Sequence, residues 1–210
     1  MAVSMGLSPL QVGILFAARQ IAAGIAQLPA GLIGDNLRGR GNFLLGTFWW
    51  VSVAQLMASG STKYWFIVGF LTLASAGAAA WHPVAMGAMT QWMPERKGFV
   101  IAIHMVGGTV AEIAAPLLVG VLLMFLDWDM VLQINTVPTI ILGLLFLKLA
   151  PMVIAPPKEP GIGLNISDLA KSIVRPGVLA ILLVIILHNM SMIAFMSMAP
   201  LYFQEVKGFS

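Results

Sequence analysis

The sequence predicts an all-α protein that crosses a membrane six times, and two observations support this fold class. Hydrophobic residues make up 60% of the 210 residues and charged residues only 9%, whereas soluble domains carry about 25% charged residues. Apolar runs of about 20 residues, long enough to cross a bilayer as a helix, recur along the whole chain. The sequence contains no cysteine, which excludes disulfides and thiolate chemistry.

The first predicted span begins at a distinct helix start. Ser8 can cap the helix, Pro9 suits its first position, and Gln11 completes a capping box. Near the other end of the chain, 151–163 is too rich in proline and glycine to span a membrane. The apolar spacing of 164–174 predicts a short amphipathic helix on the membrane surface. The six spans are expected at 9–34, 42–59, 64–89, 99–126, 130–149 and 176–199.

The basic residues predict the orientation in the membrane. Because lysine and arginine concentrate in cytoplasmic loops, the side that carries most of them is expected to be cytoplasmic. Lys63 and Lys207 fall on the opposite side, and both chain ends are therefore expected outside. Because the basic residues are few and lie in short loops, they indicate the topology, and no nucleic-acid partner is expected. The cytoplasmic set is Arg38, Arg40, Arg96, Lys97, Lys148, Lys158, Lys171 and Arg175.

Glu112 is the only carboxylate deep inside an apolar run. It lies about 21 Å along its helix from the preceding charged turn and shares a stripe with His104 and Gly108. A charge in lipid is costly, so this position suits a group that takes up and releases a proton. The alternative is a structural carboxylate held by a hydroxyl, a backbone group or an arginine.

Arg19 lies at a comparable depth in the first span, about 16 Å from Ser8. Its guanidinium can bind an anionic group with two hydrogen bonds or pair with a carboxylate. A structural ion pair is the alternative, and pairing with Glu112 is left open. Small and polar residues share one face of this span, which suits close helix packing and includes two candidates for lining a cavity. These residues are Gly13, Gln20, Gly24, Gln27 and Gly31.

The three histidines, His82, His104 and His188, could in principle bind metal. No two of them are close in sequence, and no acidic or cysteine ligands surround them. A polar or packing role is therefore favoured, and no metal is expected. His82 follows the small-residue stretch 74–80, where a neighbouring helix can approach closely, and could line a path. His188 and Asn189 could line the same cavity.

The loop at 31–40, GLIGDNLRGR, resembles the loop signature of the major facilitator superfamily. That signature places a glycine, an aspartate four residues later and a basic tail between the second and third helices. Gly31, Asp35 and Arg40 match in place, whereas Asn36 stands where an arginine is usual. The resemblance implies that these charges lock the cytoplasmic face in one state of a transport cycle.

A second resemblance, to the fosmidomycin-resistance-like drug-efflux branch of that superfamily, covers the middle of the chain. It rests on His82-Pro83, on the turn 94–98 and on the stretch that follows. Within that stretch, Ala115-Pro116 is similar to the antiporter motif of the family's fifth helix, where Gly-Pro is usual. The antiporter-like set is Gly107, Gly108, Ala115, Pro116 and Gly120.

The resemblance implies a twelve-helix bundle, of which the six spans are helices two to seven. The chain would then be truncated at both ends. Residues 1–151 would hold the helices of the N-terminal half without its first helix, and 152–175 would be a cytoplasmic linker containing the amphipathic helix. Residues 176–210 would hold the first helix of the C-terminal half.

The resemblance also implies a secondary transporter in the plasma membrane, as in a bacterial inner membrane. It would export a small organic molecule by alternating access in exchange for protons, with no cofactor. The candidates for transport and coupling are Arg19, Glu112, His104 and His82, and those for lining the cavity are Gln20, Gln27, His188 and Asn189.

A non-transporting six-helix subunit, for assembly or sensing, is the alternative, and the length of the native chain would distinguish it. An enzyme is not predicted, because no Ser/His/Asp set, P-loop or metal cluster stands out. The glycine pairs are interpreted as packing features.

Overall fold

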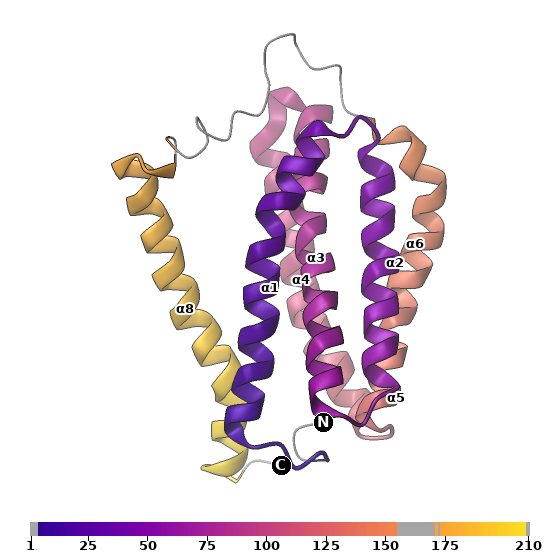
Figure 1. Ribbon diagram of the computed structural model, residues 1–210, viewed down its shortest axis with the longest axis vertical. Coiled ribbons are helices and arrows are strands. Elements are labelled where there is room, and N and C mark those ends of the chain that lie inside the picture. The colour runs from indigo at the N-terminus through magenta and orange to yellow at the C-terminus, as the bar shows by residue number, and fades with distance from the viewer. Residues whose placement is uncertain (1–3, 155–170, 172, 209–210) are drawn as a thin grey trace. The chain divides into compact units, whose positions relative to one another are not determined.

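The computed structural model describes residues 4–154, 171 and 173–208, and the chain divides into two compact units, Met1–Pro157 and Lys158–Ser210. The regular structure of the described residues is helical, apart from one isolated antiparallel bridge between Gly39 and Ile154. The predicted all-α fold class is therefore confirmed. The first unit is a set of helices that run side by side (Figure 1).

The first unit holds α1 (Pro9–Asn36), α2 (Arg40–Ser59), α3 (Tyr64–Trp92), η1 (Pro94–Arg96), α4 (Lys97–Leu123), α5 (Trp128–Ile134), α6 (Thr136–Leu149) and η2 (Ala150–Met152). The second unit holds α8 (Pro176–Glu205), which continues six residues beyond the predicted end of the last span. The predicted amphipathic helix at 164–174 lies largely outside the described residues. The two units meet in sequence at 157/158, and the predicted domain boundaries stay predictions.

The predicted helix start is confirmed at α1. The Ser8 hydroxyl accepts a hydrogen bond from the Gln11 backbone N–H at 3.3 Å, and the Ser8 N–H donates to Gln11 Oε1 at 2.8 Å. This reciprocal pair satisfies two of the N–H groups that a helix start leaves without partners. The beginning of α1 is thus encoded by local sequence.

Five helical segments are long and apolar enough to cross a membrane: Pro9–Asn36, Tyr64–Trp92, Pro94–Leu123, Trp128–Met152 and Pro176–Met196. The sixth predicted span, α2, has 20 residues and a length of about 30 Å, enough for the hydrocarbon core. Its buried face includes the polar residues Thr47 and Ser52, so α2 is less apolar than the five segments above. It lies between α3 and α6 (Figure 1), and its crossing of the membrane stays a prediction.

The predicted fifth span lies within one segment long and apolar enough to cross a membrane, Trp128–Met152. A one-residue turn at Asn135 divides this segment into α5 and α6, which the sequence analysis did not predict. Pro138 has no N–H, so it cannot donate to the carbonyl of Ile134 and the helical ladder is interrupted there. The hydroxyl of Thr136 donates to the Gln133 carbonyl at 2.6 Å, which satisfies one of the acceptors near the break.

The central helix of the first unit is α3, which packs against α1, α2 and α4. Its small residues allow this, as expected for the stretch 74–80. Ala74, Gly77 and Ala80 are buried, and a Cβ on Gly77 would stand 3.1 Å from Trp50 Cγ on α2. Such a separation is tighter than nine in ten real Cβ contacts, so the two helices approach closely because residue 77 has no side chain.

At the end of the unit where α2 begins, η2 packs on the first turn of α2. The Gly41 N–H donates to the Val153 carbonyl at 3.1 Å, and a Cβ on Gly41 would collide with the Ala150 carbonyl. The apolar core of this end contains Leu44, Val84, Ala85, Ala88 and Val153, with Phe43, Trp81 and Phe146 packed around it.

The packing predicted for two glycine-bearing faces is found only at some of their glycines among the described residues. On α1, Gly34 packs against Val84 and Gly31 lies near Pro83, but a Cβ on Gly13 or Gly24 would meet nothing within 4 Å. On α4, the same holds for all three motif glycines, Gly107, Gly108 and Gly120. Within the described part of the chain, these five glycines therefore have no close neighbour, whereas Gly31 and Gly34 contact α3.

Candidate functional site

Arg40, the first residue of α2, joins three helices where α1 and α3 end. It is only 3% exposed. Its Nε donates to the Gly34 carbonyl on α1 at 2.8 Å, and its Nη1 donates to Gln91 Oε1 on α3 at 2.9 Å. Its Nη2 lies 3.6 Å from Asp35 Oδ1. The cation thus sits beside the C-terminal end of α1, where the helix dipole favours positive charge.

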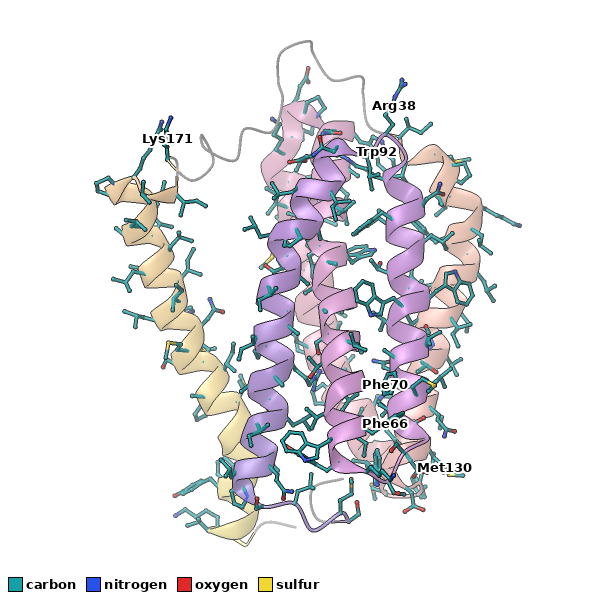
Figure 2. The ribbon with its side chains drawn as sticks, in the orientation of Figure 1. Arg38, Phe66, Phe70, Trp92, Met130 and Lys171 are labelled. Carbon is teal, nitrogen blue, oxygen red and sulfur yellow. The ribbon has the colours of Figure 1, made fainter. Side chains whose placement is uncertain are left out.

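The three interactions of Arg40 differ in their exposure to water. The Asp35 side chain is 66% exposed, so its ion pair with Arg40 is open to water and weak, whereas the bond from Arg40 to the Gly34 carbonyl is buried and the bond to Gln91 is half-buried. Gly87 on α3 lies beside the guanidinium, and a Cβ there would stand 3.4 Å from Nη1. Arg38 takes no part, and Figure 2 shows it pointing away from the helices at this end.

The three residues of the predicted loop signature therefore lie in one region. Asp35 and Arg40 face each other, and the backbone of Gly31 passes close to Pro83 on α3. Both helix ends that carry the signature are tied to α3 through Gly34, Arg40 and Gln91. The sequence analysis missed Gln91, which is an isolated amide near the end of an apolar helix.

His82 on α3 and His104 on α4 are brought into contact. Their Nδ1 and Nε2 atoms are 3.2 Å apart, and the ring planes cross at 82°. The polar or packing role expected for each histidine alone therefore does not describe the contact between these two rings. The signal was available in the turn at η1, because α3 and α4 form an antiparallel hairpin and residues on either side of its turn face each other.

Trp81 packs on both of these histidines. Its ring stacks on His104 with a centroid separation of 5.7 Å and an interplanar angle of 19°. It meets His82 edge-on at 5.6 Å. Phe48 on α2 and Phe146 on α6 extend this aromatic row, with centroid separations of 6.4 Å from Trp81 to Phe48 and 5.6 Å from Phe48 to Phe146. The row supports the histidine pair from the interior of the first unit.

Arg19 on α1 is held by a hydroxyl and not by an acid. Its Nε donates to Ser75 Oγ on α3 at 3.0 Å. In the part of the chain that the structure describes, Arg19 forms no ion pair, so the pairing with Glu112 that was left open is not formed. By helical rise, Arg19 lies about 15 Å from the start of α1 at Pro9, near the middle of the span.

Glu112 lies at a similar depth on α4, about 22 Å from the helix start at Lys97. Its side chain is exposed, and the described residues offer it neither a hydrogen bond nor an ion pair. The structural alternative for Glu112, a carboxylate held by a nearby partner, is thus unsupported within the described part. The arrangement leaves one cation and one carboxylate at mid-depth on exposed surfaces.

The four residues expected to line a cavity are divided between the two units. Gln20 and Gln27 are exposed on α1 in the first unit. His188 and Asn189 are exposed on α8 in the second unit, where Asn189 Nδ2 donates to the carbonyl of Ile185 on its own helix at 2.8 Å. Their shared role stays a prediction.

Four buried polar atoms were missed by the sequence analysis. They have no hydrogen-bond partner among the described residues, although a buried polar group is normally paired. They are Ser52 Oγ and Gln55 Oε1 on α2, and Thr72 Oγ1 and Trp81 Nε1 on α3. Residues 4–154, 171 and 173–208 contain no group of three or more His, Cys, Asp or Glu that could hold a metal ion.

Comparisons with known proteins add one finding. A family model described as Major Facilitator Superfamily matches residues 1–210. Neither the curated proteins nor the solved structures contain a match. The family match covers the described units and agrees with the loop signature at Gly31, Asp35 and Arg40.

Proposed function

This chain belongs to the major facilitator superfamily, a family of multi-pass integral membrane transporters of small molecules, and we propose that it serves proton-coupled efflux of a small organic molecule. Transport would proceed by alternating access, with the substrate near mid-membrane. The motif at 107–120 supports the antiporter assignment and the resemblance to the drug-efflux branch. The plasma membrane is the proposed location.

The observation that carries this proposal is the pair of unneutralised charges at mid-depth. Arg19 and Glu112 are exposed near the middle of their spans and have no charged partner among the described residues. A lipid-facing charge at this depth is costly, so such residues face protein or a water-filled path and serve an ion or substrate. The mid-depth position of these two charges and their lack of a charged partner both suit a transporter.

The two charges have different proposed roles. Glu112 would bind a proton from the outside and release it to the cytoplasm, because a carboxylate can be neutralised at modest cost where lipid disfavours its charge. Arg19 remains charged and would hold an anionic group of the substrate, oriented by its bond to Ser75. If the proton and the substrate cannot be bound at the same time, each transport cycle exchanges one for the other across the membrane.

The Arg40 site would act as the cytoplasmic lock. Arg40 is fixed by Gly34 and Gln91, whereas its pair with Asp35 is exposed. An exposed ion pair contributes little stability, typically about 0–1 kcal/mol, so it can break and form again as the bundle moves. Asp35 is therefore the proposed exchangeable partner and Arg40 the fixed one.

A ΔpH assay tests the proposal without knowledge of the substrate. The native full-length protein would be expressed in bacteria, and everted vesicles with an acidic lumen would be treated with separate panels of small organic anions, cations and zwitterions. A proton-coupled exporter should dissipate ΔpH when a substrate is added, and vesicles without the protein should not respond. If no panel produces a response although the protein is in the membrane, the non-transporting subunit becomes the better interpretation.

A further inference from the structure

We infer that His82 and His104 together form a site for one shared proton, placed between Glu112 and the predicted cytoplasmic face, through which protons pass to and from Glu112. The shared-proton site rests on the geometry of the two rings. Its use in transit rests in addition on the proposed proton-coupled function, and the experiments below separate the two.

The contact between the rings admits one extra proton. At 3.2 Å, one of the facing nitrogens must carry a hydrogen and donate it, while the other accepts with its lone pair. In the neutral pair, the donating ring still has a free lone pair on its outer nitrogen. A proton added there makes that ring an imidazolium, and its hydrogen bond to the neutral partner becomes charge-assisted.

A second proton is opposed by the same contact. It would place N–H groups on both facing nitrogens, removing the acceptor and setting two positive rings against each other. Two groups that interact this strongly take up protons in two separate steps that belong to the pair. The pair therefore changes charge by one over the range in which a single histidine would titrate.

Trp81 favours the positive charge on one of the two rings. Its ring stacks on His104 at a centroid separation of 5.7 Å, within the range of about 6 Å at which a cation gains from an aromatic face. The rings of Trp81 and His82 are nearly perpendicular, at 86°, and so lack this parallel stacking. His104, on the same helix as Glu112, is thus the favoured carrier of the added proton.

His104 of the pair lies on the same stripe of α4 as Glu112 and nearer the predicted cytoplasmic end of that helix. His104 lies about 10 Å from the helix start at Lys97, and Glu112 lies about 12 Å further along. Gly108 stands between them, and a Cβ there would meet nothing within 4 Å. The stripe is therefore open at the position between the two groups, and the proposed transit requires water to connect them there.

The other titratable groups leave this assignment intact. Among the described titratable groups on α3, α4 and the helices packed against them, Arg19 and Glu112 are the others that lie well inside a span. Both lie nearer the predicted outer face than the histidine pair does. The rest are at helix ends or in turns. They are Asp35 on α1, Arg40 on α2, Tyr64 on α3, Glu95 and Arg96 on η1, Lys97 on α4, and Asp129 on α5.

Histidine-selective ¹⁵N NMR of the native full-length protein in nanodiscs tests the site directly, with signals assigned by His82→Gln and His104→Gln. We expect a scalar coupling across the hydrogen bond and two proton-binding steps whose affinities differ more than tenfold. Trp81→Leu should weaken the first step about two- to fivefold. Independent titration of both rings near pH 6.5, as for unperturbed histidines, would overturn the site. Stoichiometric Zn²⁺ binding by both rings would also overturn it.

Proton-driven efflux tests the transit role. His82→Gln, His104→Gln and the double variant should each slow efflux by a similar factor, because the pair acts as one unit and the effects are not additive. Additive effects, or none, would overturn the transit role. Glu112→Gln should abolish coupled efflux while leaving the two NMR steps in place. If the wild-type protein shows no proton-driven efflux, the transit role fails with the proposed function, and the NMR steps alone still support the proton site.

Discussion

Arg19 Nε on α1 donates a hydrogen bond of 3.0 Å to Ser75 Oγ on α3, and within the described residues this hydroxyl is the guanidinium's polar partner. Two helices are thereby joined near mid-membrane through a cation whose charge remains uncompensated there. A structural ion pair would have removed that charge. The geometry instead leaves it available to an anionic ligand.

The first prediction concerns this bond. Arg19→Gln should raise the substrate concentration for half-maximal transport at least tenfold, because it removes the charge. Ser75→Ala should raise it only about two- to tenfold, because one hydrogen bond contributes about 0.5–1.5 kcal/mol. Transport of an anionic substrate identified in the vesicle assay provides the measurement. Equal effects of the two substitutions would show that the hydroxyl, and not the charge, matters.

The second prediction concerns Arg40. Arg40→Ala should lower the free energy of unfolding by about 1–3 kcal/mol, because it leaves the buried Gly34 carbonyl without its charged donor and removes the half-buried bond to Gln91. Thermal unfolding in detergent is the measurement. Arg38→Ala is the matched control, since Arg38 points away from the helices (Figure 2) and its loss should change stability little. Similar losses in the two variants would contradict the assignment.

The third prediction tests the close approach of η2 to α2. Gly41→Ala should destabilise the protein by about 1–3 kcal/mol, because the added methyl group collides with the Ala150 carbonyl. Gly46→Ala makes the same change on the same helix where nothing lies within 4 Å. It should be neutral or stabilise the helix by up to about 1 kcal/mol. The reverse order of stabilities in the same unfolding assay would refute the predicted packing.

The fourth prediction concerns the buried hydroxyl of Ser52, which lacks a partner among the described residues. Ser52→Ala should be neutral or stabilising by about 1 kcal/mol, because a buried unpaired polar group is a cost. Ser59→Ala is the matched control on α2, since the Ser59 hydroxyl donates to the Leu56 carbonyl at 2.8 Å. That substitution should cost about 0.5–1.5 kcal/mol. A larger loss at Ser52 than at Ser59 would mean that Ser52 serves a partner outside the described residues.

The sequence predicted those parts of the fold that depend on local chemistry. The cap at Ser8 and Gln11 is encoded within four residues, and the apolar runs follow from composition alone. The break in the fifth span was also local, and its signal was Pro138. It was not predicted because residues 130–149 are mostly apolar and together have the length of one membrane span.

The candidate site was predictable only where a motif fixes residues that are near in sequence. Asp35 and Arg40 belong to one loop signature and lie together. His82 and His104 are 22 residues apart on two helices, so their contact depends on the hairpin geometry of α3 and α4. Arg19 and Ser75 are 56 residues apart, and no local pattern relates them.

Glu112 offers the most direct test of the central claim, that mid-membrane charge couples protons to transport. The measurement is substrate-induced dissipation of ΔpH in everted vesicles that contain wild-type protein, Glu112→Gln or the control Glu95→Gln at equal membrane levels. Glu95 lies in the exposed turn η1, so it undergoes the same chemical change outside the spans. The account predicts that Glu112→Gln abolishes the response and Glu95→Gln retains it. An undiminished pH-dependent response in Glu112→Gln would contradict the coupling role.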